Sequence, residues 1–142
     1  MARDPAKLLI PEGSGGASAN KPFDDARLKV IKGDVKNQAD VDALFDAADD
    51  ISGVIVALGG RTKNVGPTML TDGTSNIVNA MKRKSKAKRI CLVTSIGCGD
   101  SAGKAPLKFK MLMYTVMSSI YKDKNRQENI FLSSSGAGHD LE

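Results

Sequence analysis

Apolar residues in this chain are concentrated in three short runs, and a turn of small, polar or glycine residues follows each run. The runs lie near residues 28–33, 53–58 and 89–95. The second and third runs are nearly continuous in apolar residues, which is typical of parallel strands covered on both faces. A stretch with helical periodicity comes after each run. The pattern therefore predicts an α/β fold in which helices connect three parallel strands.

The predicted helices have recognisable starts. Asn37 is a suitable N-cap, with Asp40 in the first turn, where the helix dipole favours negative charge. Pro67 suits the start of the next helix. Residues 107–121 are apolar and rich in methionine, as in segments that fill a core or a subunit contact, and residues 122–132 predict a polar helix. The expected buried faces of the first two helices carry Val41, Leu44, Phe45 and Ala48, and Leu70, Thr74, Ile77 and Met81.

The chain has 142 residues, enough for a single domain, and a formal net charge of +5. Much of the positive charge lies in the run KRKSKAKR at residues 82–89. Such a run suits the solvated end of a helix, where cations are favoured. The alternative is a patch for nucleic acid or anionic lipid, but no aromatic residues interleave for stacking on bases. We therefore predict neither nucleic acid nor membrane as a partner.

The sequence also bears on the cellular compartment. No apolar run approaches the length of a membrane span, and the first residues lack the apolar stretch of a secretory signal. Two cysteines are too few for a disulfide framework or a zinc site, so no metal is predicted. Cys91 lies in a predicted strand and should be buried, whereas Cys98 lies in a turn and should be exposed. We expect the cytoplasm, or the stroma or matrix of an organelle, and not secretion.

Residues 12–22 are rich in glycine and predict a flexible surface loop. A phosphate-binding loop would have to follow a strand and open a helix. Here no predicted strand precedes the glycines, and Pro22 follows them. The lone histidine, His139, lies in a polar tail at residues 136–142 and is expected to be exposed rather than catalytic.

Several motifs together resemble a known family. VTSIGCGDS at residues 93–101 is followed by YKDKNRQE at 121–128, and GDV at 33–35 precedes the helical ADVDALF. With ARDPAKL near the start and TDGTSNIVNAMK at 71–82, these motifs are similar to the atypical short-chain dehydrogenase/reductase family. Within it the chain resembles NmrA-like proteins and biliverdin-IXβ or flavin reductases. The resemblance implies a Rossmann-like three-layer fold and an NADPH-dependent reductase that passes hydride to a small conjugated acceptor.

The resemblance also implies which residues bind the adenosine half of the cofactor. Arg3 matches a basic position that meets the adenosine 2′-phosphate, which favours NADP, although NAD also suits the family. A guanidinium has the donors that a phosphate needs. Asp34 and Val35 match the pair that holds the edge of the adenine. The turn beside the ribose is matched by Ala57, Leu58 and Gly59.

At the nicotinamide end, the family pattern places Thr94 and Ser95 near the reacting ring. Lys124 matches the lysine of the YxxxK motif, which contacts ribose hydroxyls, so Ser95 and Lys124 are the catalytic candidates. The tyrosine of that motif is missing, because Ile120 stands four residues before Lys124. Tyr121 is only three residues before it, a difference of about 100° around a helix. A tyrosine proton donor is therefore not expected, which leaves hydride transfer with a proton from water.

Relative to the family pattern, residues 1–142 predict a single incomplete domain. It lacks the first βα unit, with its G-x-x-G-x-x-G turn, and the last strands. Without two strands between them, the runs at 28–32 and 54–58 would stand about 14 Å apart, or three interstrand spacings. Either these runs pair directly, or another segment fills the gap, or the product is incomplete. We expect residues 1–142 alone to bind NAD(P) weakly, because no glycine turn holds the pyrophosphate. We also expect self-association through open strand edges or residues 107–121. A non-catalytic NAD(P)-sensing module and an inactive truncated product are the alternative functions.

Overall fold

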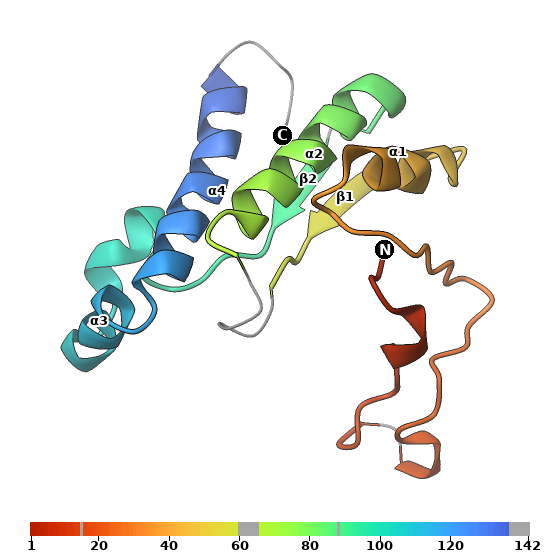
Figure 1. The fold of residues 1–142 in the computed structure, drawn as a ribbon, viewed down its shortest axis with the longest axis horizontal. Helices are drawn as coiled ribbons and strands as arrows, with labels where there is room; N and C mark the ends of the chain where they lie inside the picture. Colours follow the sequence, from red (N-terminus) through yellow and green to blue (C-terminus); the bar gives the residue numbers. More distant parts are fainter. Residues whose placement is uncertain (15, 60–65, 88, 137–142) are drawn as a thin grey trace.

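A computed structural model describes residues 1–14, 16–59, 66–87 and 89–136 (Figure 1). The described residues include two strands and four α-helices. The strands are β1 (Gly53–Val56) and β2 (Arg89–Leu92), and the helices are α1 (Gln38–Asp46), α2 (Met69–Lys84), α3 (Leu107–Tyr114) and α4 (Ser118–Gly136). Short 3-10 turns occur at Pro5–Lys7, Gly16–Ser18 and Gly99–Lys104.

The two strands are parallel, as predicted. Gly53 pairs with Arg89 and Val56 with Leu92, and the N–H of Val93 donates to the carbonyl of Val56 at 2.9 Å. Helix α2 connects the strands, so this part is a βαβ unit. The α/β class with parallel strands, consistent with a partial Rossmann fold, is confirmed.

The predicted strand at residues 28–33 is reduced to an isolated bridge. Lys32 pairs in parallel with Ala2, whose N–H donates to Ile31 O at 2.9 Å and whose carbonyl accepts from Gly33 N–H at 3.1 Å. The direct pairing of 28–32 with 54–58 does not occur among the described residues. Among the described residues, Ala2 alone is bridged to this run, so no partner strand extends the pairing.

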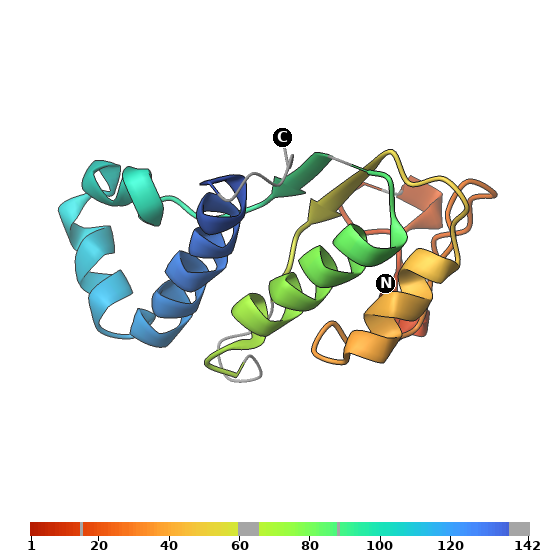
Figure 2. The same ribbon diagram turned by 90° about the horizontal axis from the view of Figure 1, so that it is seen from above.

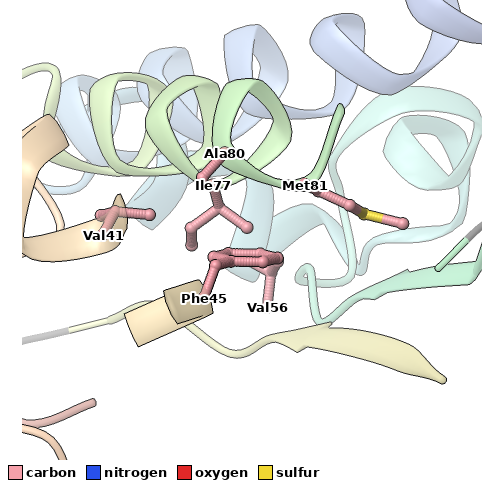
Figure 3. Packing of buried hydrophobic residues seen from close by; sticks show 6 residues of the cluster. All are labelled: Val41, Phe45, Val56, Ile77, Ala80 and Met81. Atoms are coloured by element: carbon pink, nitrogen blue, oxygen red, sulfur yellow. The ribbon is translucent and has the colours of Figure 1, made fainter. Parts of the chain in front are cut away.

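Helices α1 and α2 lie on the same face of the strand pair (Figure 2). Their apolar faces meet β1 in a core cluster shown in Figure 3, made of Val41, Phe45, Val56, Ile77, Ala80 and Met81. Asn37 caps α1 as predicted, because its side chain accepts a hydrogen bond from the N–H of Ala39 at 3.0 Å. All four residues predicted for the buried face of α2 are buried.

The opposite face of the strand pair is exposed, so the prediction of strands covered on both faces is wrong. Ile55 is 76% exposed and Val93 is 52% exposed, while Val56 on the other face is buried. Successive side chains of a strand point to opposite faces. Because α1 and α2 cover one face (Figure 2), the alternate residues of the strands are left exposed on the other.

Helix α4 packs along α2, and α3 leads into it (Figure 1). The methionine-rich run at 107–121 is not one helix, because α3 ends at Tyr114 and α4 begins at Ser118. Met113 is buried as expected, but Met111 is exposed. A second core cluster forms where α3 and α4 meet the turn after β2. It consists of Cys98, Ala105, Met113 and Tyr121.

The first three cations of the basic run, Lys82, Arg83 and Lys84, lie in the last turn of α2, as predicted. Arg83 pairs with Asp42 at 2.8 Å and Lys84 with Asp46 at 2.7 Å, so two of its cations neutralise carboxylates of α1. Residues 12–22, where the structure describes them, belong to a hairpin in which Ile10 N–H bonds to Lys21 O at 2.9 Å. Within the described ranges, none of the helices is apolar over a length sufficient to cross a bilayer.

Candidate functional site

A cavity of about 290 Å³ opens at the carboxyl end of β1. In parallel α/β sheets this edge is where ligands bind. The turn at residues 33–36 forms one wall, and residues 57–59 form the other. The lining includes Arg3, Asp34, Val35, Ala57, Leu58 and Gly59, together with Lys36 and Met69. All the residues predicted for the adenosine half of a cofactor therefore surround one cavity.

The turn at Asp34 and Val35 is held by hydrogen bonds from both neighbouring helices. The carboxylate of Asp40, on α1, accepts from Asp34 N–H at 2.8 Å, and the amide of Asn76, on α2, donates to Val35 O at 2.9 Å. One oxygen of Asp34 accepts from Lys36 N–H at 3.0 Å. The N–H of Val35 has no partner among the described residues. The turn therefore offers a carboxylate and a free N–H side by side.

Glycine is required at two places around this cavity. A Cβ on Gly33 would lie 2.8 Å from the sulfur of Met1 and 3.0 Å from Cβ of Asp40. A Cβ on Gly73 would lie 2.8 Å from Val35 and 2.9 Å from Leu58, so both walls of the cavity rest directly on α2. Neither Gly73 nor Asn76 is among the site residues predicted from the sequence. The signal that could have found Gly73 was a glycine inside an amphipathic helix, which needs a packing or functional reason.

Of the remaining predicted residues, Thr94 and Ser95 follow β2, and Lys124 lies on α4. Thr94 is exposed, and Ser95 and Lys124 are partly buried. The turn after Ser95 contacts α4 through the Tyr121 hydroxyl, which donates to Ile96 O at 3.3 Å. It also contacts α4 through Asn125, whose side chain accepts from Gly99 N–H at 3.2 Å. Within the part of the chain that the structure describes, Ser95 and Lys124 make no hydrogen bond with each other.

Comparison with known proteins decides the family. A model of the NAD(P)H-binding family matches residues 17–138. The chain belongs to this family. The match spans all the predicted site residues except Arg3, and it agrees with the resemblance to atypical short-chain dehydrogenases/reductases. A search of curated proteins finds no significant match.

The residues of this NAD(P)H-binding domain suit the adenosine half of the cofactor better than its pyrophosphate. The residues that carry a free N–H, a carboxylate and a guanidinium, Val35, Asp34 and Arg3, all line the cavity. In the described ranges, no glycine-rich turn opens a helix at this cavity. The start of α2 is also filled from within the protein. The carboxylate of Asp123 accepts from Leu70 N–H at 2.8 Å, Thr71 N–H at 3.2 Å and the Thr71 hydroxyl. The N-terminus of α2 is therefore not a phosphate site.

The buried groups beside Lys124 are structural. Tyr121 is 7% exposed and packs edge-to-face on Phe109, with ring centroids 6.4 Å apart. Burial and the nearby Cys98 raise the pKa of Tyr121. Burial, followed by the charge of Glu128, raises the pKa of the Cys98 thiol, while Lys124 opposes this. Both shifts favour the neutral form of the group.

Both cysteine predictions for this NAD(P)H-binding domain are wrong. Cys98 is buried and Cys91 is exposed. The turn at Cys98 folds onto α4, which covers the thiol, whereas Cys91 lies on the uncovered face of the strand pair. In the described part of the chain, no cluster of side chains could hold a metal ion.

We predict that a small alkylating reagent at neutral pH modifies Cys91 of the native domain rapidly and Cys98 slowly. The thiolate is the reactive form, and Cys98 is both buried and hard to ionise. Mass spectrometry of digested samples taken over time gives the two rates. In denaturant the two rates should become similar. Equal rates in the native domain would contradict the burial of Cys98.

Proposed function

We propose that this domain binds NADPH, with the adenosine half in the cavity beside Asp34 and Val35, and acts as a reductase for a small conjugated acceptor. The observation that supports this most directly is the free N–H of Val35 next to the Asp34 carboxylate. The edge of an adenine carries an amino donor at C6 and an acceptor at N1. A carboxylate and an N–H group match that pattern, one bond to each.

The charge around the cavity supports NADPH over NADH. Arg3 and Lys36 both line it. The guanidinium of Arg3 makes no ion pair or hydrogen bond with the described residues, so it is available to a ligand. A guanidinium binds a phosphate monoester through two parallel hydrogen bonds. The 2′-phosphate of NADPH is such a group, and NADH has a hydroxyl there.

The reducing step would use Ser95, which follows β2, and Lys124 on α4. NADPH supplies a hydride when it is bound. Lys124 would donate hydrogen bonds to ribose hydroxyls, and the Ser95 hydroxyl would orient the reacting ring or the acceptor. The proton that balances the hydride on the acceptor comes from solvent, because the hydroxyl of Tyr121 is buried and donates to Ile96 O.

The engaged hydroxyl of Tyr121 also favours a second candidate function, a non-catalytic module that senses NADPH. The two candidates differ in turnover. Loss of NADPH absorbance in the presence of a flavin or quinone acceptor would support the reductase. Binding of NADPH with no turnover of any acceptor would support the sensor.

The binding proposal is tested with fragments, because they require only the described cavity. We expect adenosine 2′,5′-bisphosphate to bind in calorimetric titration, and adenosine 5′-monophosphate to bind at least about tenfold more weakly, since it lacks the 2′-phosphate. NMR shift changes should centre on residues 33–36 and 57–59. Failure of both nucleotides to bind, or shift changes only elsewhere, would overturn the proposed site.

A matched pair of lysine variants tests the nicotinamide end. We predict that Lys124→Ala weakens NADPH binding by about 1–1.5 kcal/mol, the value of one hydrogen bond, and leaves the binding of adenosine 2′,5′-bisphosphate unchanged. Lys122 is an exposed lysine two residues earlier on α4, and Lys122→Ala should change neither. Both affinities are measured by fluorescence or calorimetric titration. If the two variants bind NADPH equally well, Lys124 is a solvated helix lysine.

A further inference from the structure

We infer that Asn76 is a positioning residue that makes the cavity selective for adenine over a 6-oxo purine. It acts on the turn at Asp34 and Val35 and does not touch the ligand itself. The inference rests on the proposed binding of the adenosine half in this cavity.

The direction of the Val35 N–H follows from the bonds around it. The carbonyl of Asp34 accepts from Asn37 N–H at 2.9 Å, which closes the turn. In a trans peptide the N–H and the C=O point in opposite directions. Because the carbonyl of the 34–35 peptide points into the turn, its N–H, which belongs to Val35, points out of the turn.

Asn76 fixes the next peptide of the same turn. Its side-chain amide donates to Val35 O at 2.9 Å from a position 41 residues further along the chain. Without this bond, the 35–36 peptide would keep only the bond from Lys36 N–H to the Asp34 carboxylate, and the turn that presents the Val35 N–H and that carboxylate would be less firmly positioned. Asn76 is partly buried on α2, directly after the close contact between Gly73 and Val35.

Helix α1 holds the other end of the turn. Asp40 accepts from Asp34 N–H at 2.8 Å. The two helices are also linked here, because the side chain of Gln38 on α1 donates to the backbone carbonyl of Asn76 on α2 at 3.1 Å. The same amide donates to Asp42, within α1, at 2.9 Å. Hydrogen bonds from both helices therefore hold Asn76 and the Asp34–Val35 pair in place beside the cavity.

A rigid donor and acceptor distinguish purines by their edges. Adenine presents an acceptor at N1 and a donor at C6. Hypoxanthine presents the reverse, an N1–H donor and an O6 acceptor. Against this turn, the N1–H of hypoxanthine would face the Val35 N–H, and O6 would face the Asp34 carboxylate. Both contacts would be repulsive and unpaired, which is the kind of mismatch that polar sites reject strongly.

The test compares adenosine 2′,5′-bisphosphate with inosine 2′,5′-bisphosphate by calorimetric titration of the full chain. We expect the wild type to prefer the adenine compound by about tenfold or more, and Asn76→Ala to reduce that preference to about threefold or less. Asn76→Asp keeps the size of the side chain but cannot donate to Val35 O, so it should lose the preference as well. Asn79 is an exposed asparagine on the same helix, and Asn79→Ala should keep it.

The outcomes separate the inference from the function on which it rests. If the wild type binds neither bisphosphate, the proposed function fails and the inference fails with it. If the wild type prefers adenine and both Asn76 variants keep the same ratio, the site stands and the inference is overturned. A loss of affinity for both compounds in equal proportion would also overturn it, because that result indicates only a structural role. Circular dichroism confirms that each variant folds.

Discussion

Replacing Asp123 with alanine should lower the free energy of unfolding by about 2–4 kcal/mol, the cost of leaving buried donors without an acceptor. The side chain is 1% exposed and accepts from the N–H groups of Leu70 and Thr71 and from the Thr71 hydroxyl. These N–H groups are at the start of α2, where no helical carbonyl can accept from them. Thr68, the residue before α2, makes no capping bond with its own side chain. A residue of α4 therefore caps a helix that begins more than fifty positions earlier.

Two further variants test whether the loss of stability comes from the lost cap on α2. Asp72 lies in the first turn of the same helix but is exposed, so Asp72→Ala should cost well under about 1 kcal/mol. Asp123→Asn keeps one carbonyl oxygen and should fall between the two alanine variants. Urea unfolding followed by circular dichroism measures all three, since the chain has no tryptophan for fluorescence. An Asp123→Ala protein as stable as Asp72→Ala would show that Asp123 does not cap α2.

The second large effect concerns the choice of cofactor. Arg3→Ala should weaken NADPH binding by about 1.5–3 kcal/mol, the value of a charge-assisted hydrogen bond, and leave NADH binding almost unchanged. The physical reason is that only NADPH carries a 2′-phosphate at the position where the guanidinium of Arg3 lines the cavity. Competition between the two cofactors for the same titration signal gives the ratio directly.

Arg27 provides the control for this prediction. Its guanidinium already pairs with Asp25 at 2.8 Å, and it does not line the cavity. Arg27→Ala should therefore leave the preference for NADPH intact. The effect of Arg3→Ala should also shrink as the salt concentration rises, because the contact is between charges at a solvent-exposed site. An equal loss of affinity for both cofactors would rule out Arg3 as a phosphate ligand.

Local signals in the sequence predicted the helical part of the fold well. The spacing of Leu70, Thr74, Ile77 and Met81 gave the buried face of α2, and Asn37 gave the start of α1. Both are local properties, because a helix face and a cap depend on residues within a few positions of each other. The clustering of residues 34–35 with 57–59 also followed from a general rule, that the carboxyl ends of parallel strands meet at one edge.

Long-range contacts explain what the sequence did not reveal. Nothing near residues 28–33 in the sequence indicates that this run has Ala2 as its bridge partner. The exposure of Cys91 and the burial of Cys98 depend on which segments cover each one, and α4 covers Cys98 from more than twenty residues away. Asn76 and Asp123 act across 41 and 53 positions, so local periodicity gave no sign of their roles.

In the described structure β1 pairs with β2 along one edge, so its backbone amides fall into two groups that exchange hydrogen at different rates. Val56 O accepts from Val93 N–H, and successive residues of a strand direct their backbone groups to opposite edges. Val54 and Val56 therefore exchange hydrogen slowly, because their N–H groups are tied to β2. The N–H of Ile55 points to the edge that no described residue pairs with, so it exchanges with solvent as rapidly as a loop amide. Deuterium uptake along a strand of four residues should alternate from one residue to the next, and a fast Ile55 amide between two slow ones is the signature of that open edge.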